Sequence, residues 1–483
     1  MINKFDSKHF LKAKMIKFGK LCKVQGGFAF KSTWYKGDGI PLVRISSLVN
    51  GIVQFDEKTV FLDPSLLKEY SDFTLKKGDT LIAMSGATTG KMAVYSDNQE
   101  ALLNQRVGRF KLLSDLPVDP KYISYLVNQI RDRVLKDAYG AAQPNISPKQ
   151  IEEIEVPYFP LNEQQLIVSE IEKQFSRLDE AVASLRRIQS NLKRYKAAVL
   201  KAAVEGKLTE QWRKDHPAIE PADQFLKRIL TERRTKWETE ELAKMKAKGI
   251  KPKDVSWKKK YKEPAVPDTA NLPELPEGWV WTNFEQLAEA SPNALKAGPF
   301  GSALKKEYYV PNGYKVYGQE QVISGDPFYG DYYIDQDRFD TLKSCAVKSG
   351  DILISLVGTI GKVLILPEDI EPGIINPRLV KLSMNKSYVI PEFVKAYLQS
   401  DAVRHSFSTR SHGGTMDILN LSMLKELPVP LPPITEQKLL IENIESSFSI
   451  AEELETTIET NLKRAERLRQ TILQQAFSGG LVS

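Results

Sequence analysis

The sequence predicts an α+β protein in which two β-rich lobes form a pseudo-twofold repeat and are joined by two long helices that pair with each other. Three observations lead to this prediction. The 483-residue chain repeats one pattern in its two halves, each half begins with short apolar runs broken by turn residues, and each half ends in a long stretch with an apolar stripe. A chain of this length exceeds one ordinary core, so at least two domains are expected.

The repeat has a shift of about 273 residues, which is the separation of Gly140 and Gly413. From these glycines the halves read GAAQPNISPKQIEEIEVPYFPLNEQQLI and GGTMDILNLSMLKELPVPLPPITEQKLL. Upstream, KKGDTLIAM at residue 76 matches KSGDILISL at residue 348, and Asn-Gln-Arg at 104–106 matches Asn-Pro-Arg at 376–378. A unit this long is a duplicated half-molecule rather than a solenoid repeat.

The apolar runs occur in the same order in both halves. The first half contains IPLVRISSL, TLIAMS, KMAVY and VGRFKLL, and the second contains YKVYGQEQV, DILISLV, KVLILP and RLVKLSM. Gly, Asp and Asn separate these runs, which is typical of β-strands joined by turns. A proline-rich bridge then leads from each set of strands into the long stretch that closes the half.

Long helices are expected at about residues 162–204 and 435–477, because neither stretch contains Pro or Gly. At 1.5 Å per residue each would be roughly 65 Å long. Their apolar side chains recur at spacings of three and four, and so narrow a stripe has to be buried against a partner, for which the other long helix is nearest. The residues predicted to pack between the helices are Ile171, Phe175, Leu178, Val182, Leu185, Leu192, Ile444, Phe448, Ile458, Leu462, Leu468 and Ile472.

These patterns divide the chain into five segments: a first lobe (1–160), a first long helix (161–205), a central basic region (206–275), a second lobe (276–433), and a second long helix with a C-terminal tail (434–483). The formal net charge is +7, and residues 201–263 account for all of it with 18 Lys/Arg against 11 Asp/Glu. Residues 244–262 hold nine lysines and one acidic residue. That stretch is either a solvated linker or a strip that lies near a polyanion such as nucleic acid.

Other bulk features limit the class of protein. The two cysteines, Cys22 and Cys345, cannot build a disulfide framework, so a reducing, cytoplasmic setting is expected. The N-terminal stretch MINKFDSKHF lacks the apolar core of a signal peptide. No apolar run approaches the roughly 18 residues that a membrane span needs, so no membrane association is expected.

The glycine loop GATTGK at residues 86–91 resembles a phosphate-binding loop but departs from the pattern that nucleotide binding requires. It has three residues between its glycines where four are needed, and Met92 follows Lys91 where a hydroxyl would bind magnesium. The second copy, GTIGK at 358–362, is shorter still, and strand-like runs flank both copies, so each is predicted to be a hairpin that carries a lysine.

No other catalytic centre is recognisable. The four histidines do not combine with cysteines at the spacing of a metal site, and no glycine-rich strand-to-helix motif for a methyl-donor cofactor is present. The sequence therefore predicts no catalytic residue, no metal site and no cofactor bound by this chain.

Two similar lobes on a rigid helical spacer suit the reading of a two-part site on a long polymer, and side chains with donors and acceptors can meet phosphates and base edges. The loops of the two lobes differ, which indicates two unlike half-sites and an asymmetric target. The predicted DNA-binding residues are Lys31, Ser32, Arg44, Ser46, Thr88, Thr89, Lys91, Arg106, Gln143 and Asn145 in the first lobe and Lys305, Lys306, Tyr317, Gln319, Thr359, Lys362, Arg378, Arg410 and His412 in the second.

Alternatives remain open for these residues. Each is also compatible with ordinary surface solvation. Arg106 and Arg378 could instead pair with carboxylates within the lobe, and Gln143 and Asn145 could cap the turn before the bridge. A coiled-coil adaptor that binds protein without DNA specificity is the alternative function. Salt separates the two functions, because a reader that contacts several phosphates loses affinity steeply as salt rises.

Over nearly its whole length, the chain resembles the specificity subunits of type I restriction–modification enzymes. The resemblance is carried by GFAFKS at 27–32, GPFGSALK at 298–305, the KKGD and KSGD strings with their Gly-Lys hairpins, and the paired VP…P…EQ segments. AVLKAAVEGKLTEQWR at 198–213 and LPELPEGWVW at 272–281 are similar to the family's central region and second-lobe entry. The first lobe lacks that entry, so its edge is expected to be completed by the C-terminal part of the chain.

The resemblance implies two target recognition domains, a spacer of two antiparallel helices, and a subunit that does no chemistry itself. Its implied partners are double-stranded DNA, two modification (methyltransferase) subunits and, through them, restriction/translocase subunits. S-adenosylmethionine, ATP and magnesium would then be bound by those partner subunits.

Overall fold

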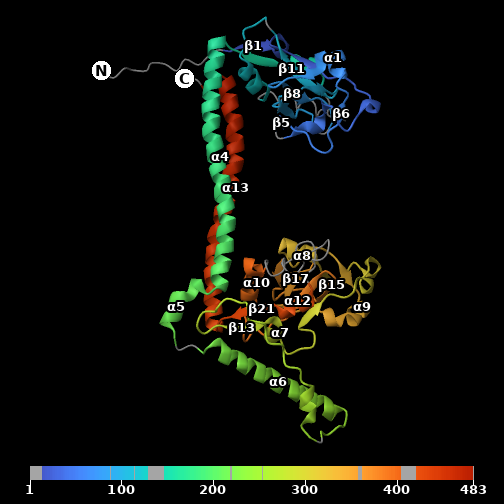
Figure 1. The fold of residues 1–483 in the computed structure, drawn as a ribbon, viewed down its shortest axis with the longest axis vertical. Helices are drawn as coiled ribbons and strands as arrows, with labels where there is room; N and C mark the ends of the chain where they lie inside the picture. Colours follow the sequence, from blue (N-terminus) through green and yellow to red (C-terminus); the bar gives the residue numbers. More distant parts are fainter. Residues whose placement is uncertain are drawn as a thin grey trace, which may run out of the picture. The chain divides into compact units, whose positions relative to one another are not determined.

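The computed structural model describes residues 13–481 except 50, 87–88, 114, 129–145, 218–219, 253, 357–361 and 404–419. It divides into two compact units: unit 1 consists of Met1–Arg187 and Thr457–Ser483, and unit 2 of Ile188–Thr456. Each unit contains one β-rich lobe, called lobe 1 or lobe 2 accordingly, and one half of each long helix, α4 (Leu161–Val204) and α13 (Ile434–Phe477) (Figure 1). As expected, C-terminal residues complete the unit that contains lobe 1.

Lobe 1 consists of two sheets and one separate strand pair. The larger sheet has the order β2 (Cys22–Gly26), β11 (Val107–Leu112), β8 (Thr80–Ala83), β9 (Met92–Val94), β5 (Gly51–Val53), β4 (Leu48–Val49). The second has the order β6 (Phe61–Leu62), β3 (Ile40–Val43), β10 (Ala101–Leu103), β7 (Thr74–Leu75). The separate pair is β1 (Lys14–Lys17) with β12 (Glu155–Tyr158), and β12 leads through the proline-rich bridge into α4.

Lobe 2 repeats this plan. One sheet has the order β14 (Leu295–Ala297), β20 (Leu379–Leu382), β17 (Ile352–Ser355), β18 (Val363–Ile365), and the other has the order β16 (Tyr333–Ile334), β15 (Tyr314–Tyr317), β19 (Gly373–Ile375). The pair β13 (Val280–Asn283) with β21 (Pro428–Leu431) corresponds to β1 with β12. Both lobes place an equivalent parallel pair, β3–β10 or β15–β19, among antiparallel neighbours, and lobe 1 has a second parallel pair, β5–β9. The duplicated architecture predicted from the sequence is therefore confirmed.

The lobes differ in the elements inserted between equivalent strands. Lobe 1 adds β4, β5 and β7, whereas lobe 2 has helices α8 and α9 in that part of the chain. The shorter helices are α1 (Leu66–Glu69), α3 (Pro148–Glu152), α5 (Glu210–Asp215), α7 (Phe284–Leu287), α8 (Gln319–Ser324), α9 (Gln336–Thr341), α10 (Pro391–Gln399) and α12 (Leu421–Glu426).

The long helices pair antiparallel, as each unit shows separately. In unit 1, Arg469 near the end of α13 pairs with Asp179 in the first half of α4. In unit 2, Lys196 near the end of α4 donates to Glu455 in the first half of α13, with 2.8 Å between Nζ and Oε2. Each helix has 44 residues, close to the predicted bounds.

The seam between the helices is apolar at most of the predicted positions. The buried ones are Ile171, Phe175, Leu192, Ile444, Ile458 and Ile472, and the half-buried ones are Leu178, Val182, Leu185, Phe448 and Leu462. Leu468 is 47% exposed, so its prediction was wrong. At 100° per residue, residues 465, 469, 472 and 476 of α13 form one buried or half-buried stripe, and position 468 lies about 70° from its centre.

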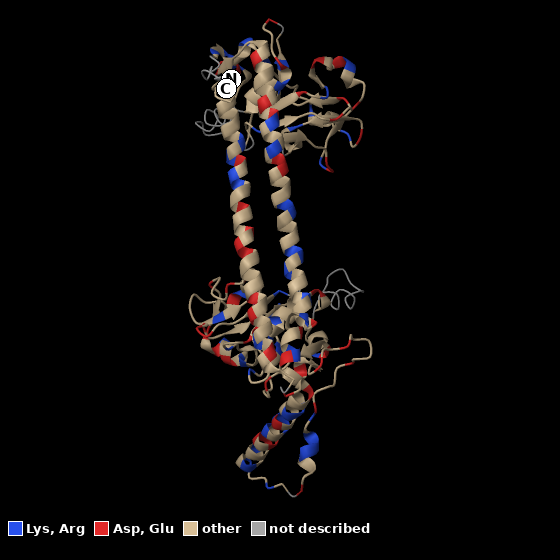
Figure 2. Cartoon of the chain, turned by 90° about the vertical axis from the view of Figure 1, so that its left-hand side faces the viewer, with Lys and Arg blue, Asp and Glu red and all other residues tan. Residues whose placement is uncertain are grey.

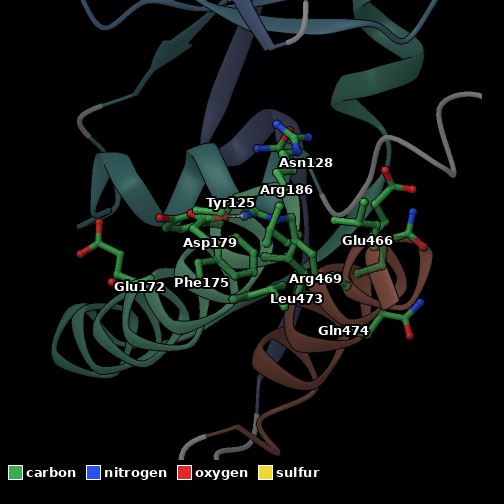
Figure 3. A pocket seen from close by; sticks show the side chains of 17 residues that line it. Tyr125, Asn128, Glu172, Phe175, Asp179, Arg186, Glu466, Arg469, Leu473 and Gln474 are labelled. Atoms are coloured by element: carbon green, nitrogen blue, oxygen red, sulfur yellow. Dashed lines mark hydrogen bonds and ion pairs between the residues drawn. The ribbon is translucent and has the colours of Figure 1, made fainter. Parts of the chain in front are cut away.

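A groove runs beside the seam in unit 1, between α4, α13 and the helical residues 120–128 (Figure 3). The Arg469 guanidinium lies 4.4 Å from the centre of the Phe175 ring, and Tyr125 makes a T-shaped contact with the same ring at 5.8 Å between ring centres. A cation–π contact and an ion pair thus hold the helices together here, where the sequence predicts apolar packing alone.

Buried glutamines from the two EQ motifs fix the start of each long helix. Gln164 donates to the carbonyl of Phe159 at 2.7 Å and accepts from the N–H of Asp119 at 2.9 Å. Gln437 donates to Pro432 at 2.9 Å and accepts from Ile390 at 2.8 Å. Each amide therefore ties the first turn of a long helix to the lobe that precedes it, which explains why both halves carry this string.

The central region is helical rather than an extended linker. The 26-residue helix α6 (Ala222–Ala247) begins after Pro221 and is free of Pro and Gly. A returning segment with the short 3-10 helix Ser256–Lys260 follows it and folds back along it. Together they form an arm, residues 222–267, on unit 2 (Figure 2). Among the helices that the structure describes, none is long and apolar enough to cross a bilayer.

Candidate nucleic-acid interface

In lobe 1, three loops with predicted DNA-binding residues meet at one edge of the larger sheet. The strand register places them there, because Gly26 at the end of β2 pairs with Gly108 at the start of β11, and Val107 pairs with Ala83 at the end of β8. The β8–β9 hairpin turns at this same edge. The loop after β2, the β8–β9 hairpin and the β10–β11 loop are therefore neighbours, and we call this edge the loop edge of lobe 1.

Lobe 2 has an equivalent loop edge. Ala297 at the end of β14 pairs with Val380, and Ser355 at the end of β17 pairs with Leu379 at the start of β20. The loop after β14, the β19–β20 loop, and the end of β17 with the start of β18 converge for the same topological reason. Both halves therefore present the same arrangement of loops with different residues, as an asymmetric two-part reader requires.

The two Asn-x-Arg sequences occupy equivalent backbone positions at the loop edges. The carbonyl of Arg106 accepts a hydrogen bond from the N–H of Met84, and the carbonyl of Arg378 accepts one from Leu356, both at 3.0 Å. Each arginine is thus held by its backbone beside the Gly-Lys hairpin, while its side chain is exposed. A fixed backbone with an exposed guanidinium suits contact with a guanine edge or a phosphate.

The motif glycines allow the loop after β2 or β14 to lie against the Asn-x-Arg loop. A Cβ atom on Gly27 would collide with the carbonyl oxygens of Leu103 and Asn104, and one on Gly298 would collide with that of Asn376. Only glycine permits this approach. The GFAFKS and GPFGSALK strings therefore bring their lysines to the same edge as the arginines.

A hydrogen-bonded chain orients one arginine of lobe 2. Arg378 donates from Nη1 to Oε1 of Gln319 at 3.3 Å, and Gln319 donates from Nε2 to Oγ of Ser355 at 2.8 Å. Ser355 is fully buried on β17, so it is a rigid support for the two exposed or half-buried groups in front of it. The hydrogen bonds therefore hold the Arg378 side chain in a defined direction at the loop edge.

Most predicted residues in the described part of the chain lie at the surface. Lys91 and Gln319 are half-buried, and the exposed ones are Lys31, Ser32, Arg44, Ser46, Arg106, Lys305, Lys306, Lys362 and Arg378. Two of the lysines have neighbours of their own. The Lys31 ammonium lies 5.9 Å from the centre of the Trp34 ring, and Lys305 lies 3.6 Å from a Glu307 carboxylate oxygen.

Two predicted contacts were wrong because their side chains are buried. Tyr317 is 1% exposed on β15, where its hydroxyl donates to the carbonyl of Glu371 at 2.7 Å and burial raises its pKa. Thr89 is 2% exposed, and its hydroxyl donates to the carbonyl of Gly86 at 2.8 Å within the hairpin turn. Both polar groups are used inside the lobe. The remaining predictions, Thr88, Gln143, Asn145, Thr359, Arg410 and His412, lie outside the described residues.

The intralobe ion pair proposed as an alternative role for Arg106 and Arg378 belongs to other residues. In lobe 1, Arg109 is buried and lies 3.1 Å from Asp79, the aspartate of the KKGD string. At the equivalent position of lobe 2, Lys381 lies 3.9 Å from Asp351. Burial raises the pKa of Asp351 and lowers that of Lys381. The KKGD and KSGD motifs are therefore structural.

Two residues of the lobe 2 loop edge carried no recognisable signal in the sequence. Ser355 lies within an apolar strand and reads as part of the core. Phe300 in the GPFGSALK string is 89% exposed, although an isolated phenylalanine between Pro299 and Gly301 gives no hint of its orientation. An exposed aromatic ring at this edge can contact the methyl group of thymine.

Three other strings that carry the family resemblance converge on one buried carboxylate in unit 2. Glu436 is 1% exposed and accepts from Nε1 of Trp279 at 2.9 Å and from Oγ1 of Thr209 at 2.6 Å. Arg213 pairs with it and lies over the Trp279 ring, with 5.7 Å between its Cζ atom and the ring centre. The central region, the entry of lobe 2 and the start of α13 are fastened together at this point.

Comparison with known proteins identifies the family of the chain. The profile of the type I restriction modification DNA specificity domain matches residues 12–194 and again 279–464. The chain is 24% identical over 471 residues to the type I restriction enzyme EcoBI specificity subunit of Escherichia coli, covering 97% of this chain and 86% of that protein. It is 23% identical over 465 residues to the EcoKI specificity subunit of Escherichia coli K12, covering 93% and 84%.

The fold has a solved counterpart. One chain of a structure described as "Structural basis underlying complex assembly and conformational transition of the type I R-M system" aligns with a TM-score of 0.61 and 15% identity, and the alignment covers 98% of this chain and all of that one. The two matched ranges contain the two lobes with most of both long helices. The chain therefore belongs to the type I restriction modification DNA specificity domain family and carries that domain twice.

Proposed function

We propose that this chain is the DNA-recognition subunit of a type I restriction–modification complex, in which each loop edge reads one half of an asymmetric, two-part target. The observation that carries the proposal is the gathering of basic and amide side chains from three loops at one sheet edge, once in each lobe. The different loops on the two equivalent frames give each lobe a target half of its own.

The chemistry of methylation and cleavage belongs to other subunits in this proposal. Two modification subunits would dock on the chain and use S-adenosylmethionine, and restriction/translocase subunits would use ATP and magnesium. The contribution of this chain is to select the DNA site. The sequence supports this division, because its glycine loops lack the spacing and the hydroxyl of a nucleotide site.

The main test is Arg378→Ala, which removes the exposed guanidinium that Gln319 orients. Loss of a specific base contact is expected to weaken binding to the target by about 1–3 kcal/mol and to relax the preference at one position of one half-site. Fluorescence anisotropy with a panel of duplexes that differ at single target positions measures both effects.

Lys362→Ala is the matched control in the same loop edge. An ammonium that contacts a phosphate contributes equally to all sequences. This variant should therefore bind every duplex more weakly with an unchanged sequence preference, and the slope of its log affinity against log salt concentration should fall by about one. If Arg378→Ala leaves the preference at every position intact, the loop edge of lobe 2 does not read bases.

The helices provide a second prediction, which concerns the distance between the half-sites. We expect an insertion of seven helix-forming residues after Leu185, with seven more at the facing position of α13, to lengthen the tolerated spacer. Seven residues add about 10 Å to a helix, which is roughly three base pairs of B-DNA. Methylation assays on targets with graded spacers give the result, and an unchanged optimum would show that the helices do not set the spacing.

The alternative function, a protein-binding adaptor without DNA specificity, makes the opposite prediction for salt. A reader that neutralises six or more phosphates loses about a thousandfold in affinity between 50 and 200 mM salt. Binding of an adaptor to its protein partner would change far less, and the adaptor would not discriminate between target and scrambled duplexes.

A further inference from the structure

We propose that the arm, residues 222–267, is a second DNA-binding element that grips the phosphate backbone outside the target, without regard to sequence. The inference rests on the proposed function, since the lobes have to hold a duplex for the arm to meet it. It concerns a part of the chain outside both ranges that match the specificity domain. Five features of unit 2 support it.

The base of the arm is fixed to lobe 2. Phe225, Leu226 and Ile229 are buried against Tyr388, and the hydroxyl of Tyr388 donates to Glu232. Arg233 donates from Nη1 to the carbonyls of Glu285 and Ala288 at 2.6 and 3.3 Å. These contacts span two turns of α6, so the helix leaves the lobe in a set direction.

The distal half of the arm is closed by aromatic side chains. Trp237 on α6 stacks on Trp257 of the returning segment with 6.0 Å between ring centres, and Tyr261 lies 5.3 Å from Trp237. Lys258 donates to Glu238 at 2.6 Å beside this cluster. The two segments of the arm are therefore packed together as one folded element. Its Trp237, Trp257 and Tyr261 rings are buried or half-buried between these segments, so they are not available for stacking with unpaired bases.

The tip of the arm, residues 246–262, carries lysine side chains whose charge the arm itself does not neutralise. Three carboxylates are paired near the aromatic cluster: Glu238 with Lys258 and Arg234, Glu241 with Lys244, and Glu263 with Arg234. Two more, Glu240 and Asp254, are exposed and form no ion pair with a described residue, so they offset two positive charges. Six exposed lysines have no ion pair or side-chain hydrogen bond with any described residue: Lys246, Lys248, Lys251, Lys259, Lys260 and Lys262. Figure 2 shows the basic colour along the returning segment.

The kind of charge favours DNA over an acidic protein surface. Residues 239–262 contain no arginine, and arginine is enriched at protein–protein interfaces whereas lysine is depleted there. An ammonium group is a hydrated point charge on a flexible stem, which suits contact with evenly spaced phosphates and carries no base preference. The duplex bound by the lobes is the polyanion that the same unit already meets in the proposed function.

The position of the arm on lobe 2 indicates contact outside the target. Tyr388, on which α6 packs, follows the end of β20, where Leu382 pairs with Ile352 and Leu295 at the sheet edge opposite the loop edge. Beyond Arg233, the last of the contacts that fix its base, α6 continues for 14 residues, which is about 21 Å. The lysines are therefore carried away from the bases that the loop edge would read, toward flanking backbone.

The test replaces Lys246, Lys248 and Lys251 with Gln in the full-length chain, in complex with its modification subunits. The control replaces Lys201, Lys207 and Lys214 with Gln, which removes the same charge from exposed positions outside the arm. Binding is measured against salt for a target duplex with long flanks, for one cut close to the target, and for a scrambled duplex with long flanks.

On long duplexes the tip variant should bind about ten- to a hundredfold more weakly at 0.1 M salt than the unaltered chain, with the salt slope reduced by about two to three. The loss should be equal for target and scrambled sequences and absent on the short duplex. Binding to the long duplexes with the slope and affinity of the control would overturn the inference. The inference would also be overturned if the tip variant bound DNA normally but lost a modification subunit. In that case the double variant Ile250→Ser with Val255→Ser, at two exposed apolar residues of the tip, should lose the same subunit.

The outcome is distinct from failure of the proposed function. If the unaltered chain does not prefer the target to the scrambled duplex, the lobes do not read DNA. If the unaltered chain does prefer the target, but the tip variant binds DNA as tightly as the control variant, the proposed function stands and only the role of the arm is wrong.

Discussion

Replacing Glu436 with Ala should destabilise unit 2 by about 3–5 kcal/mol, because a buried charge pair loses one partner and the other is left without compensation. Arg213 would keep its hydrogen bonds to Thr209 and to the carbonyl of Gly206 but lose its counter-charge, and the indole N–H of Trp279 would lose its acceptor. Five of the six tryptophans lie in unit 2, so chemical denaturation followed by tryptophan fluorescence reports on this unit.

The repeat supplies the control for this prediction. Glu163 occupies the equivalent position at the start of α4, is half-buried, and has no ion pair or hydrogen bond with a described residue through its side chain. Glu163→Ala should change the free energy of unfolding by less than about 0.5 kcal/mol, as expected for a side chain without such partners. Equal effects at both positions would mean that the carboxylate acts through helix formation and not through the Arg213 and Trp279 contacts.

Replacing Arg109 with Ala should have an effect of similar size in unit 1. The guanidinium donates to the carbonyls of Thr74 at 2.5 Å and Asp72 at 2.6 Å, to Oε1 of Gln25 at 2.7 Å, and to Asp79. Its side chain is 8% exposed, so the acceptors around it would lose a charged donor without access to much water. We expect a loss of about 3–5 kcal/mol. Hydrogen exchange at the amides of β8 and β11 measures it locally.

Arg109→Lys tests the same contacts in finer detail. In lobe 2 the equivalent Lys381 donates to the carbonyl of Ala346 at 2.6 Å, which corresponds to the Thr74 contact of Arg109. A lysine at position 109 should therefore keep that bond and lose those to Gln25 and Asp72, at a cost of about 1–3 kcal/mol. A lysine variant as unstable as the alanine variant would show that the frame of lobe 1 depends on the planar guanidinium.

The fold was predictable because its signals are periodic and doubled. The apolar stripe of the long helices is visible in positions such as Ile171 and Ile472, and the same turn residues punctuate both sets of strands. Leu468 was misplaced because residues three and four apart in the sequence do not all lie in one stripe when the helix is straight.

The candidate site was predictable only by residue type and chain order. Tyr317 and Thr89 have the chemistry of base-reading residues, and no local pattern shows that their hydroxyls are used by Glu371 and Gly86. The arm was not predictable for a related reason. Its closure depends on Trp237 meeting Trp257 across a lysine-rich stretch whose composition alone resembles a linker.

The way unit 1 is assembled has a consequence for biosynthesis. Its core includes Ile472, Leu473 and Phe477 of α13, and the Phe477 ring lies 5.3 Å from that of Tyr122. Unit 2 is one continuous span that ends at Thr456. The half translated first is thus completed last, and the ribosome exposes an unfinished first lobe until nearly the whole chain has emerged. A nascent chain that stalls in the last helix would leave apolar surface for chaperones to cover, even though its second half had already closed.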